Sequence, residues 1–174
     1  MQKKVVRSLV AAGLLFSISS TTLAATDNQS SQIELKFNAT IDIDGVENIL
    51  IEDPTLGSDA TGEDGFCVGG FGFPTFSITF ESNDGKNDTE FSLINSDESQ
   101  KVNYSVGFDN STTGSFTTVT QGVALTNQKR NNASCSGTDN ARFQITVANA
   151  DWQTSDVLDG TSYTDTLMIT VASE

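Results

Sequence analysis

Apolar and polar side chains alternate one by one through much of the chain after residue 32. The longest alternating run covers residues 33–43, where the apolar positions are Ile33, Leu35, Phe37, Ala39, Ile41 and Ile43. A period of two places the apolar side chains on one face of an extended strand, whereas a helix needs a period of 3.6. The pattern predicts a long, regular β-strand.

The same alternation recurs in shorter segments bounded by glycine or polar residues. It predicts strands at residues 46–51, 76–80, 91–93, 102–108, 116–119, 143–147 and 163–171. The turn signal Asn83-Asp84-Gly85 favours a hairpin between 76–80 and 91–93, because Asn, Asp and Gly tolerate positive φ. Roughly eight strands with polar breaks predict an all-β protein, and they favour a β-sandwich.

Two segments lack the alternation and are predicted as loops. Residues 53–72 are rich in glycine and acidic residues, and residues 126–139 are polar. The run Gly69-Gly70-Phe71-Gly72 is predicted to form a flexible bend before the next strand. Residues 151–160 have room for a single helical turn or a long connection.

The first 24 residues have the composition of a signal peptide. Lys3, Lys4 and Arg7 precede a short apolar run at residues 8–18, and small side chains at Thr22 and Ala24 suit cleavage after Ala24. The apolar run is shorter than the roughly 20 residues that a bilayer span needs, so we expect no membrane anchor. The predicted organisation is a signal peptide at 1–24, an N-terminal extension at 25–44 and one β-sandwich domain at 45–174.

The chain is strongly acidic. It has nine Lys and Arg residues against 23 Asp and Glu residues, and three of the basic residues belong to the predicted signal peptide. Six basic residues then face 23 acids in the mature chain, a net charge of −17. Nucleic acid is excluded as a partner, because such binding depends on Lys and Arg that neutralise phosphates. A solvated acidic surface is the simplest interpretation.

Cys67 and Cys135 are the two cysteines of the chain, and an even pair in an exported protein predicts a disulfide. The chain contains no His, which excludes a Ser-His-Asp triad and a His-based zinc site. We therefore predict no catalytic residue, no bound metal and no cofactor.

Acidic residues gather in two short stretches that raise the question of carboxylate chemistry: Asp42, Asp44 and Glu47, and then Asp59, Glu63 and Asp64. With 23 acids such groups arise by chance, so a solvated surface is favoured over glycoside hydrolysis. Asp42-x-Asp44-Gly45 partly matches a calcium loop, but its twelfth position is Asp53 instead of Glu and a strand pattern precedes it. A weak calcium site stays open as an alternative.

The overall plan resembles the subunits of chaperone-usher pili. The resemblance is carried by the signal peptide, the size of the mature chain, the run Ile33-Glu-Leu-Lys-Phe-Asn-Ala-Thr-Ile-Asp42 and the ending Gly160-Thr-Ser-Tyr-Thr-Asp-Thr-Leu-Met-Ile-Thr-Val171. An extension followed by a second strand is most similar to the alternate, CS1-like class. The two cysteines are more similar to other pilins, the spore coat U type among them, so the class is left open.

The resemblance implies a fimbrial subunit that is not an enzyme. Its fold would be an immunoglobulin-like β-sandwich that lacks its last strand and is completed by a donor strand from the next subunit. The implied donor side chains are Ile33, Leu35, Phe37, Ala39 and Ile41, and the implied groove edge is formed by Tyr163, Leu167, Ile169 and Val171. The implied partners are identical or related pilus subunits, a periplasmic chaperone and an outer-membrane usher, on an export route through the periplasm to the cell surface. The implied role is surface adhesion or biofilm formation.

Two other interpretations of the sequence remain. The alternating run also suits the first strand of its own sandwich. The chain also fits a monomeric exported domain that binds carbohydrate or calcium.

Overall fold

The computed structural model describes residues 29–52, 54–84, 89–96, 98–154 and 162–174. The predicted signal peptide, Asp53, Gly85 and Gly160 lie outside the described residues. The chain divides into two units, residues 1–35 and residues 36–174, which we describe separately. In the first unit, the described residues 29–35 have no regular secondary structure, and every strand belongs to the second.

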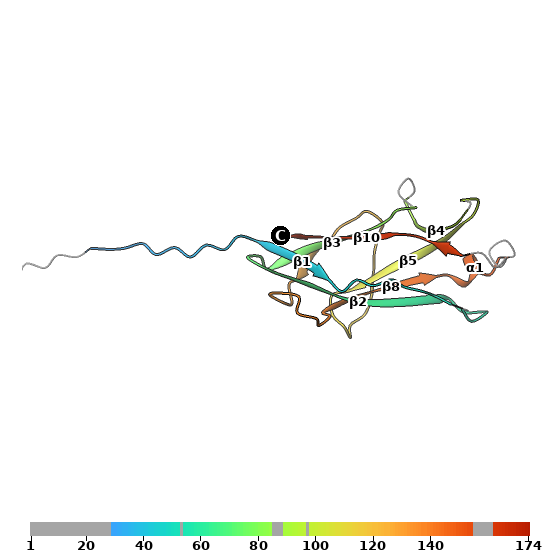
Figure 1. Ribbon diagram of the computed structural model, residues 1–174, viewed down its shortest axis with the longest axis horizontal. Helices are drawn as coiled ribbons and strands as arrows, with labels where there is room; N and C mark the ends of the chain where they lie inside the picture. The colour runs from blue at the N-terminus through green and yellow to red at the C-terminus, as the bar shows by residue number, and fades with distance from the viewer. Residues whose placement is uncertain (1–28, 53, 85–88, 97, 155–161) are drawn as a thin grey trace, which may run out of the picture. The chain divides into compact units, whose positions relative to one another are not determined.

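The described part of the second unit contains ten strands and one short helix (Figure 1). They are β1 (Thr40–Asp44), β2 (Ala60–Phe71), β3 (Thr75–Ser82), β4 (Phe91–Asn95), β5 (Lys101–Asp109), β6 (Thr117–Thr118), β7 (Leu125–Lys129), β8 (Ala141–Val147), α1 (Asn149–Trp152), β9 (Tyr163–Thr164) and β10 (Leu167–Ser173).

The strands form two sheets. The larger sheet has seven strands in the order β1-β2-β8-β5-β4-β9, with β6 paired to β5, and the smaller sheet has three in the order β10-β3-β7. All strand pairings within these sheets are antiparallel. Two antiparallel sheets that each bury one face are the sandwich arrangement that the alternation predicts.

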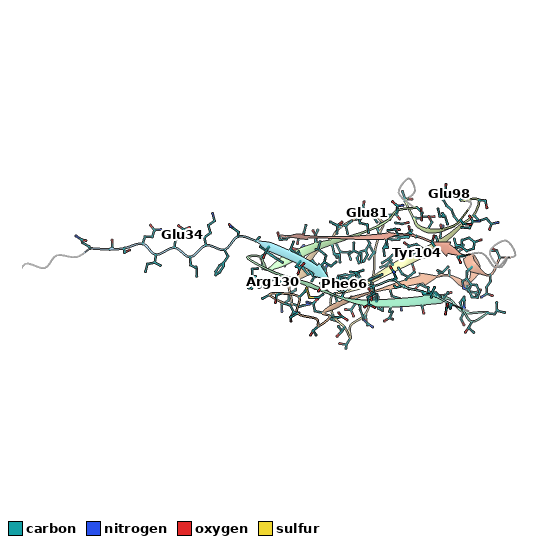
Figure 2. All side chains as sticks on the ribbon, viewed as in Figure 1. Glu34, Phe66, Glu81, Glu98, Tyr104 and Arg130 are labelled. Carbon is teal, nitrogen blue, oxygen red and sulfur yellow. A yellow bond between two sulfur atoms is a disulfide. The ribbon has the colours of Figure 1, made fainter. Side chains whose placement is uncertain are left out.

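Phenylalanine rings form the centre of the core between the sheets. Phe80 of β3 lies 5.8 Å from Phe108 of β5 and 6.0 Å from Phe143 of β8, measured between ring centroids. Phe66 of β2 joins the same group at 6.2 Å from Phe108 (Figure 2). Each ring comes from an inward position of its strand, so the predicted all-β, immunoglobulin-like β-sandwich is confirmed.

The disulfide between Cys67 and Cys135 is confirmed. Its surroundings differ from the two joined loops that the sequence suggests, because Cys67 lies in β2 and only Cys135 lies in a loop, between β7 and β8. Asn140 fixes the same loop to β2: its side-chain oxygen accepts from the Val68 N–H and its side-chain nitrogen donates to the Val68 carbonyl, both at 2.9 Å.

The prediction of a loop at residues 53–72 is wrong, because residues 60–71 form β2, the longest strand. Glycines hide the alternation there. A Cβ on Gly69 would lie 2.8 Å from the backbone nitrogen of Cys135, so this glycine allows another backbone to approach β2 closely. The glycine run therefore provides close packing and not the flexible bend that was predicted.

One predicted segment and one predicted pairing also differ from the structure. Residues 46–51 form no strand, although Ile49 and Ile51 pack against the core. The predicted hairpin is absent, because β3 belongs to the small sheet and β4 to the large one. Alternation tells which face of a strand is buried but not which strand is its neighbour.

Smaller differences concern the ends of the predicted segments. The predicted last strand is split: β9 pairs with β4 in the large sheet, and β10 pairs with β3 in the small sheet. Part of the second predicted loop forms β7, and the helical turn α1 begins at Asn149, before the predicted segment. No helix among the described residues is long and apolar enough to cross a membrane.

The long strand predicted at 33–43 is shorter in the structure. Only β1 is a strand, and it pairs with β2 of the same chain, from Thr40 opposite Phe71 to Asp44 opposite Cys67. Ile41, one of the expected donor residues, is therefore part of the chain's own sheet. The expected N-terminal extension at 25–44 thus includes β1, which is hydrogen-bonded to β2.

We predict that replacing both cysteines, Cys67→Ser with Cys135→Ser, strongly destabilises the domain. The bridge spans a sequence separation of 68 residues, and closing a loop of that length stabilises a fold by about 4 kcal/mol in the chain-entropy model. Thermal unfolding followed by circular dichroism should show a fall in Tm of roughly 10 °C. An unchanged Tm would contradict a stabilising role for the disulfide.

Candidate functional site: a seam between β1 and β10

The inner face of β10 is less buried than that of its neighbour. In β3 the inward side chains of Phe76, Ile78 and Phe80 are fully buried. Opposite them on β10, Ile169 pairs with Phe80 and Val171 with Ile78, yet both β10 side chains stay partly exposed. The reason is topological, since β10 is an edge strand of the small sheet and has a hydrogen-bonded neighbour only on its β3 side among the described strands.

On its other side, β10 faces β1 without forming a ladder with it. β1 and β10 lie close together but belong to different sheets. Between them is a depression of about 340 Å³ lined by Ile43, Asp44, Gly45, Val46, Leu167 and Ile169. We call this depression, continued along the inner face of β10 to Val171, the seam. Ile43, Leu167, Ile169 and Val171 give it apolar walls that pack against the core, and Asp44 adds a polar group beside them.

Both ends of β10 are fixed to the rest of the small sheet. Near its start, the Asn83 N–H donates to the Thr166 carbonyl at 3.1 Å, and the Asp84 N–H donates to an Asp165 carboxylate oxygen at 3.2 Å. At its end, the Glu174 N–H donates to the Thr75 carbonyl at 2.8 Å. The edge of β10 that borders the seam is thus held in place by contacts on its other side.

A tyrosine from the large sheet also holds the start of β10. The Tyr104 hydroxyl of β5 donates to the carboxylate of Asp165, which lies between β9 and β10. Burial raises the pKa of Tyr104, and the Asp165 carboxylate raises it further, so the phenol stays protonated and remains a donor. Partial burial also raises the pKa of the Asp84 carboxyl, as does the charge of Asp165 nearby.

The opposite edge of the small sheet is covered. β7 borders it, and the Asn110 side chain donates to the Lys129 carbonyl at 2.9 Å, while the Asn131 side chain donates to the Asn110 carbonyl at 3.0 Å. Asn127 has a positive φ of 57°, and the β3–β7 register shifts between Phe76 and Ile78. Side-chain caps and irregular backbone of this kind discourage pairing with a further strand.

The segment at residues 29–39 differs from a buried strand because its side chains are exposed to solvent. Its larger apolar side chains are exposed: Ile33 by 92%, Leu35 by 79% and Phe37 by 67%. Such a run of exposed apolar side chains is unusual for a protein surface and marks an interaction site or an aggregation hazard. Ala39, the remaining expected donor residue in this segment, is also exposed.

The structure brings together only part of the expected groove edge. Leu167, Ile169 and Val171 lie side by side on the inner face of β10. Tyr163 lies in β9, at the end of the large sheet. Ile43 and Val46 line the seam but were not identified from the sequence; the signal was the apolar alternation of 33–43, which assigned Ile43 to a strand without indicating its partner.

The acidic groups singled out in the sequence have structural partners. Glu63 forms an ion pair with Arg142 at 3.2 Å. Asp59 accepts from the Asn149 N–H at 2.9 Å, and Asp64 accepts from the Glu47 N–H at 2.8 Å. Asp42 and Asp44 lie in β1, a strand and not a calcium loop. The described residues contain no group of three or more acids or cysteines placed to hold a metal ion.

No protein-family model matches the sequence, and no curated protein matches it either. Among solved structures, the chain is similar to one described as a chaperone–tip adhesin complex vital for synergistic activation of CFA/I fimbriae biogenesis, with 18% identity and a TM-score of 0.52 over 77% of this chain. It also matches CfaE, the adhesive subunit of the CFA/I fimbria of enterotoxigenic Escherichia coli, with 17% identity and a TM-score of 0.39 over 73% of this chain. This chain covers 41% and 44% of those two chains, respectively.

We predict that Tyr104→Phe destabilises the domain by about 1.5 kcal/mol, because it removes a hydrogen bond to a charged group. The ring itself stays in place, packed 5.4 Å from Phe91, so the loss is confined to the hydroxyl. Chemical denaturation gives the free energy of unfolding directly. A variant as stable as the wild type would show that the contact with Asp165 contributes little.

The similarity to the chaperone–tip adhesin complex concerns the fold: the chain shares a fold with a structure from the biogenesis of a fimbria.

Proposed function

We propose that the chain is a structural fimbrial subunit that polymerises by donor-strand exchange. In this proposal residues 33–37 of one copy add to the free edge of β10 in the next copy and fill its seam. The observation that carries the proposal is that one chain contains two complementary features. One is an edge strand, β10, whose apolar inner face is partly exposed, and the other is a segment whose alternating apolar side chains are exposed.

The chemistry of the two surfaces is complementary. A strand added beside β10 gains main-chain hydrogen bonds, and every second side chain points into the sandwich. Ile33, Leu35 and Phe37 have that spacing, and burying them would contribute about 4.5 to 9 kcal/mol before the cost of ordering the segment. Ala39 lies outside the inserted residues, because its backbone packs against Gly72 of its own chain.

The segment is better suited to another copy than to its own seam. β1 begins at Thr40 directly after the segment, and a return to the same chain's seam would need a tight turn at residues 38–39. The sequence Phe37-Asn38-Ala39-Thr40 has neither Gly nor Pro, and Asn38 is its one residue of a type that tight turns favour. Exchange between copies avoids this turn.

An uncovered seam also favours partners before assembly. Exposed apolar surface beside an unpaired strand edge promotes aggregation, so such a subunit needs protection until its donor arrives. We assign that role to a periplasmic chaperone, and assembly to an outer-membrane usher, on a route to the cell surface. The similarity in fold to a chaperone–tip adhesin complex supports this assignment. Surface adhesion or biofilm formation is the role we propose for the resulting fibre.

The donor segment is tested by the double variant Leu35→Asp with Phe37→Asp. Two buried charges would prevent insertion, so the purified protein should stay monomeric under conditions in which the wild type forms polymers, as seen by size-exclusion chromatography with light scattering. The Tm of the monomer should not change, because both side chains are exposed. The matched control, Lys36→Asp with Asn38→Asp, places the same side chain on the other face of the strand and should still polymerise.

Polymers of normal length from the Leu35/Phe37 variant would contradict the proposal. A wild-type protein that remains monomeric with its seam closed by its own chain would do so too, and would favour the carbohydrate- or calcium-binding alternative.

The seam is tested from the acceptor side by Ile169→Asp. The charge would lie in the path of the donor, so this variant should fail to accept the segment of a wild-type copy, whereas Met168→Asp, on the exposed outer face of the same strand, should accept it. Mixing each variant with wild-type protein and separating heterodimers on an unheated gel measures acceptance. Ile169→Ala provides a milder change if the aspartate variant does not fold. Equal acceptance by the position 168 and 169 variants would show that the donor binds elsewhere.

A further inference from the structure

The backbone is packed tightly at the point where the N-terminal segment joins the sandwich. A Cβ on Gly72 would lie 3.0 Å from the Cα of Ala39, and a Cβ on Gly70 would lie 2.1 Å from the carbonyl oxygen of Thr40. Gly72 also has a φ of +79°, which side chains other than glycine rarely tolerate. Residues 39 and 40 therefore lie directly against the end of β2 and the residue that follows it.

Arg130 fixes this part of the chain. Its Nε donates to the Phe73 carbonyl at 3.0 Å, its Nη1 donates to the Gly70 carbonyl at 2.7 Å, and its guanidinium lies 5.7 Å from the centroid of the Phe73 ring. Its own backbone N–H donates to the Pro74 carbonyl at 3.1 Å. Figure 2 labels Arg130 in the sandwich. We call residues 70–73 together with Arg130 the joint.

The joint presents one large apolar side chain to solvent. Phe71 is 52% exposed and pairs with Thr40, the first residue of β1. Its neighbours Gly70 and Gly72 have no side chains to cover it. An exposed phenylalanine on a rigid backbone is typical of a contact surface, because little conformational freedom is lost when it is covered.

The length of the connection identifies what would cover it. This step rests on the proposed function: if residues 33–37 are buried in the next copy, only Asn38 and Ala39 separate that copy from Thr40. Two extended residues span about 7 Å, so the next copy must lie against the joint. We propose that Phe71, held by the Arg130 joint, forms a second contact surface between successive copies of this chain and fixes their relative orientation.

Phe71→Ser tests this surface. The variant keeps its donor segment and its seam, so it should form polymers in wild-type yield, but electron micrographs should show loss of the regular repeat between subunits. The monomer should keep its Tm. Leu56→Ser is the matched control, since Leu56 is also an exposed apolar side chain, at 71%, but belongs to no part of the joint; its fibres should keep the repeat.

A second pair of variants tests the joint itself. Arg130→Met releases the carbonyls of Gly70, Phe73 and Asn132 and should also disturb the repeat. Arg142→Met removes a comparable arginine, which contacts Asp109 at 3.1 Å and the Phe116 ring at 4.4 Å, and should lower the Tm while leaving the repeat intact. A regular repeat in both the Phe71→Ser and the Arg130→Met fibres would overturn the inference while leaving strand exchange standing. Absence of wild-type polymers would instead remove the proposed function, and the inference with it.

Discussion

The sandwich depends on an imbalance between its two sheets. Seven strands contribute to one layer and three to the other, so the narrow layer ends at β10 before the apolar face it covers is complete. An inward aliphatic side chain at such an edge has core atoms on one side and water on the other. That arrangement persists because the Phe66, Phe80, Phe108 and Phe143 group already holds the two layers together, and because backbone contacts hold both ends of β10.

The sequence predicted the parts of this structure that depend on local pattern. Alternation in 76–80, 102–108 and 143–147 correctly identified β3, β5 and β8, since each of these strands has one buried face and one solvent face. The disulfide followed from the cysteine count. The exposed alternating segment and the aliphatic residues of β10 could be named as a potential donor and acceptor, although only the resemblance to pilins related one to the other.

What could not be predicted depends on contacts between distant residues. β2 was missed because its glycines Gly69 and Gly70 pack against residues 135 and 40, which are too distant in the sequence for any local pattern to include. The hairpin was predicted from a turn signal, but the chain uses that connection to pass from one sheet to the other. Tyr163 and Leu167 were predicted to share a strand because the same alternation continues from one to the other. In the structure the chain passes from the large sheet to the small sheet between them, and Asp165, at that crossing, binds Tyr104. Ile43 and Val46 line the seam because β1 lies close to β10, and this contact between distant segments leaves no local pattern in the sequence.

The covered edge at β7 limits the geometry of any assembly through the small sheet. Asn110 occupies the Lys129 carbonyl, one acceptor that an incoming strand would need, so β10 is the more open of the two edges toward another chain. Units joined through a single acceptor and a single donor grow end to end and do not branch. The Asn110 contact thus disfavours lateral sheet extension, the growth mode by which edge-to-edge stacking leads to amyloid-like aggregates.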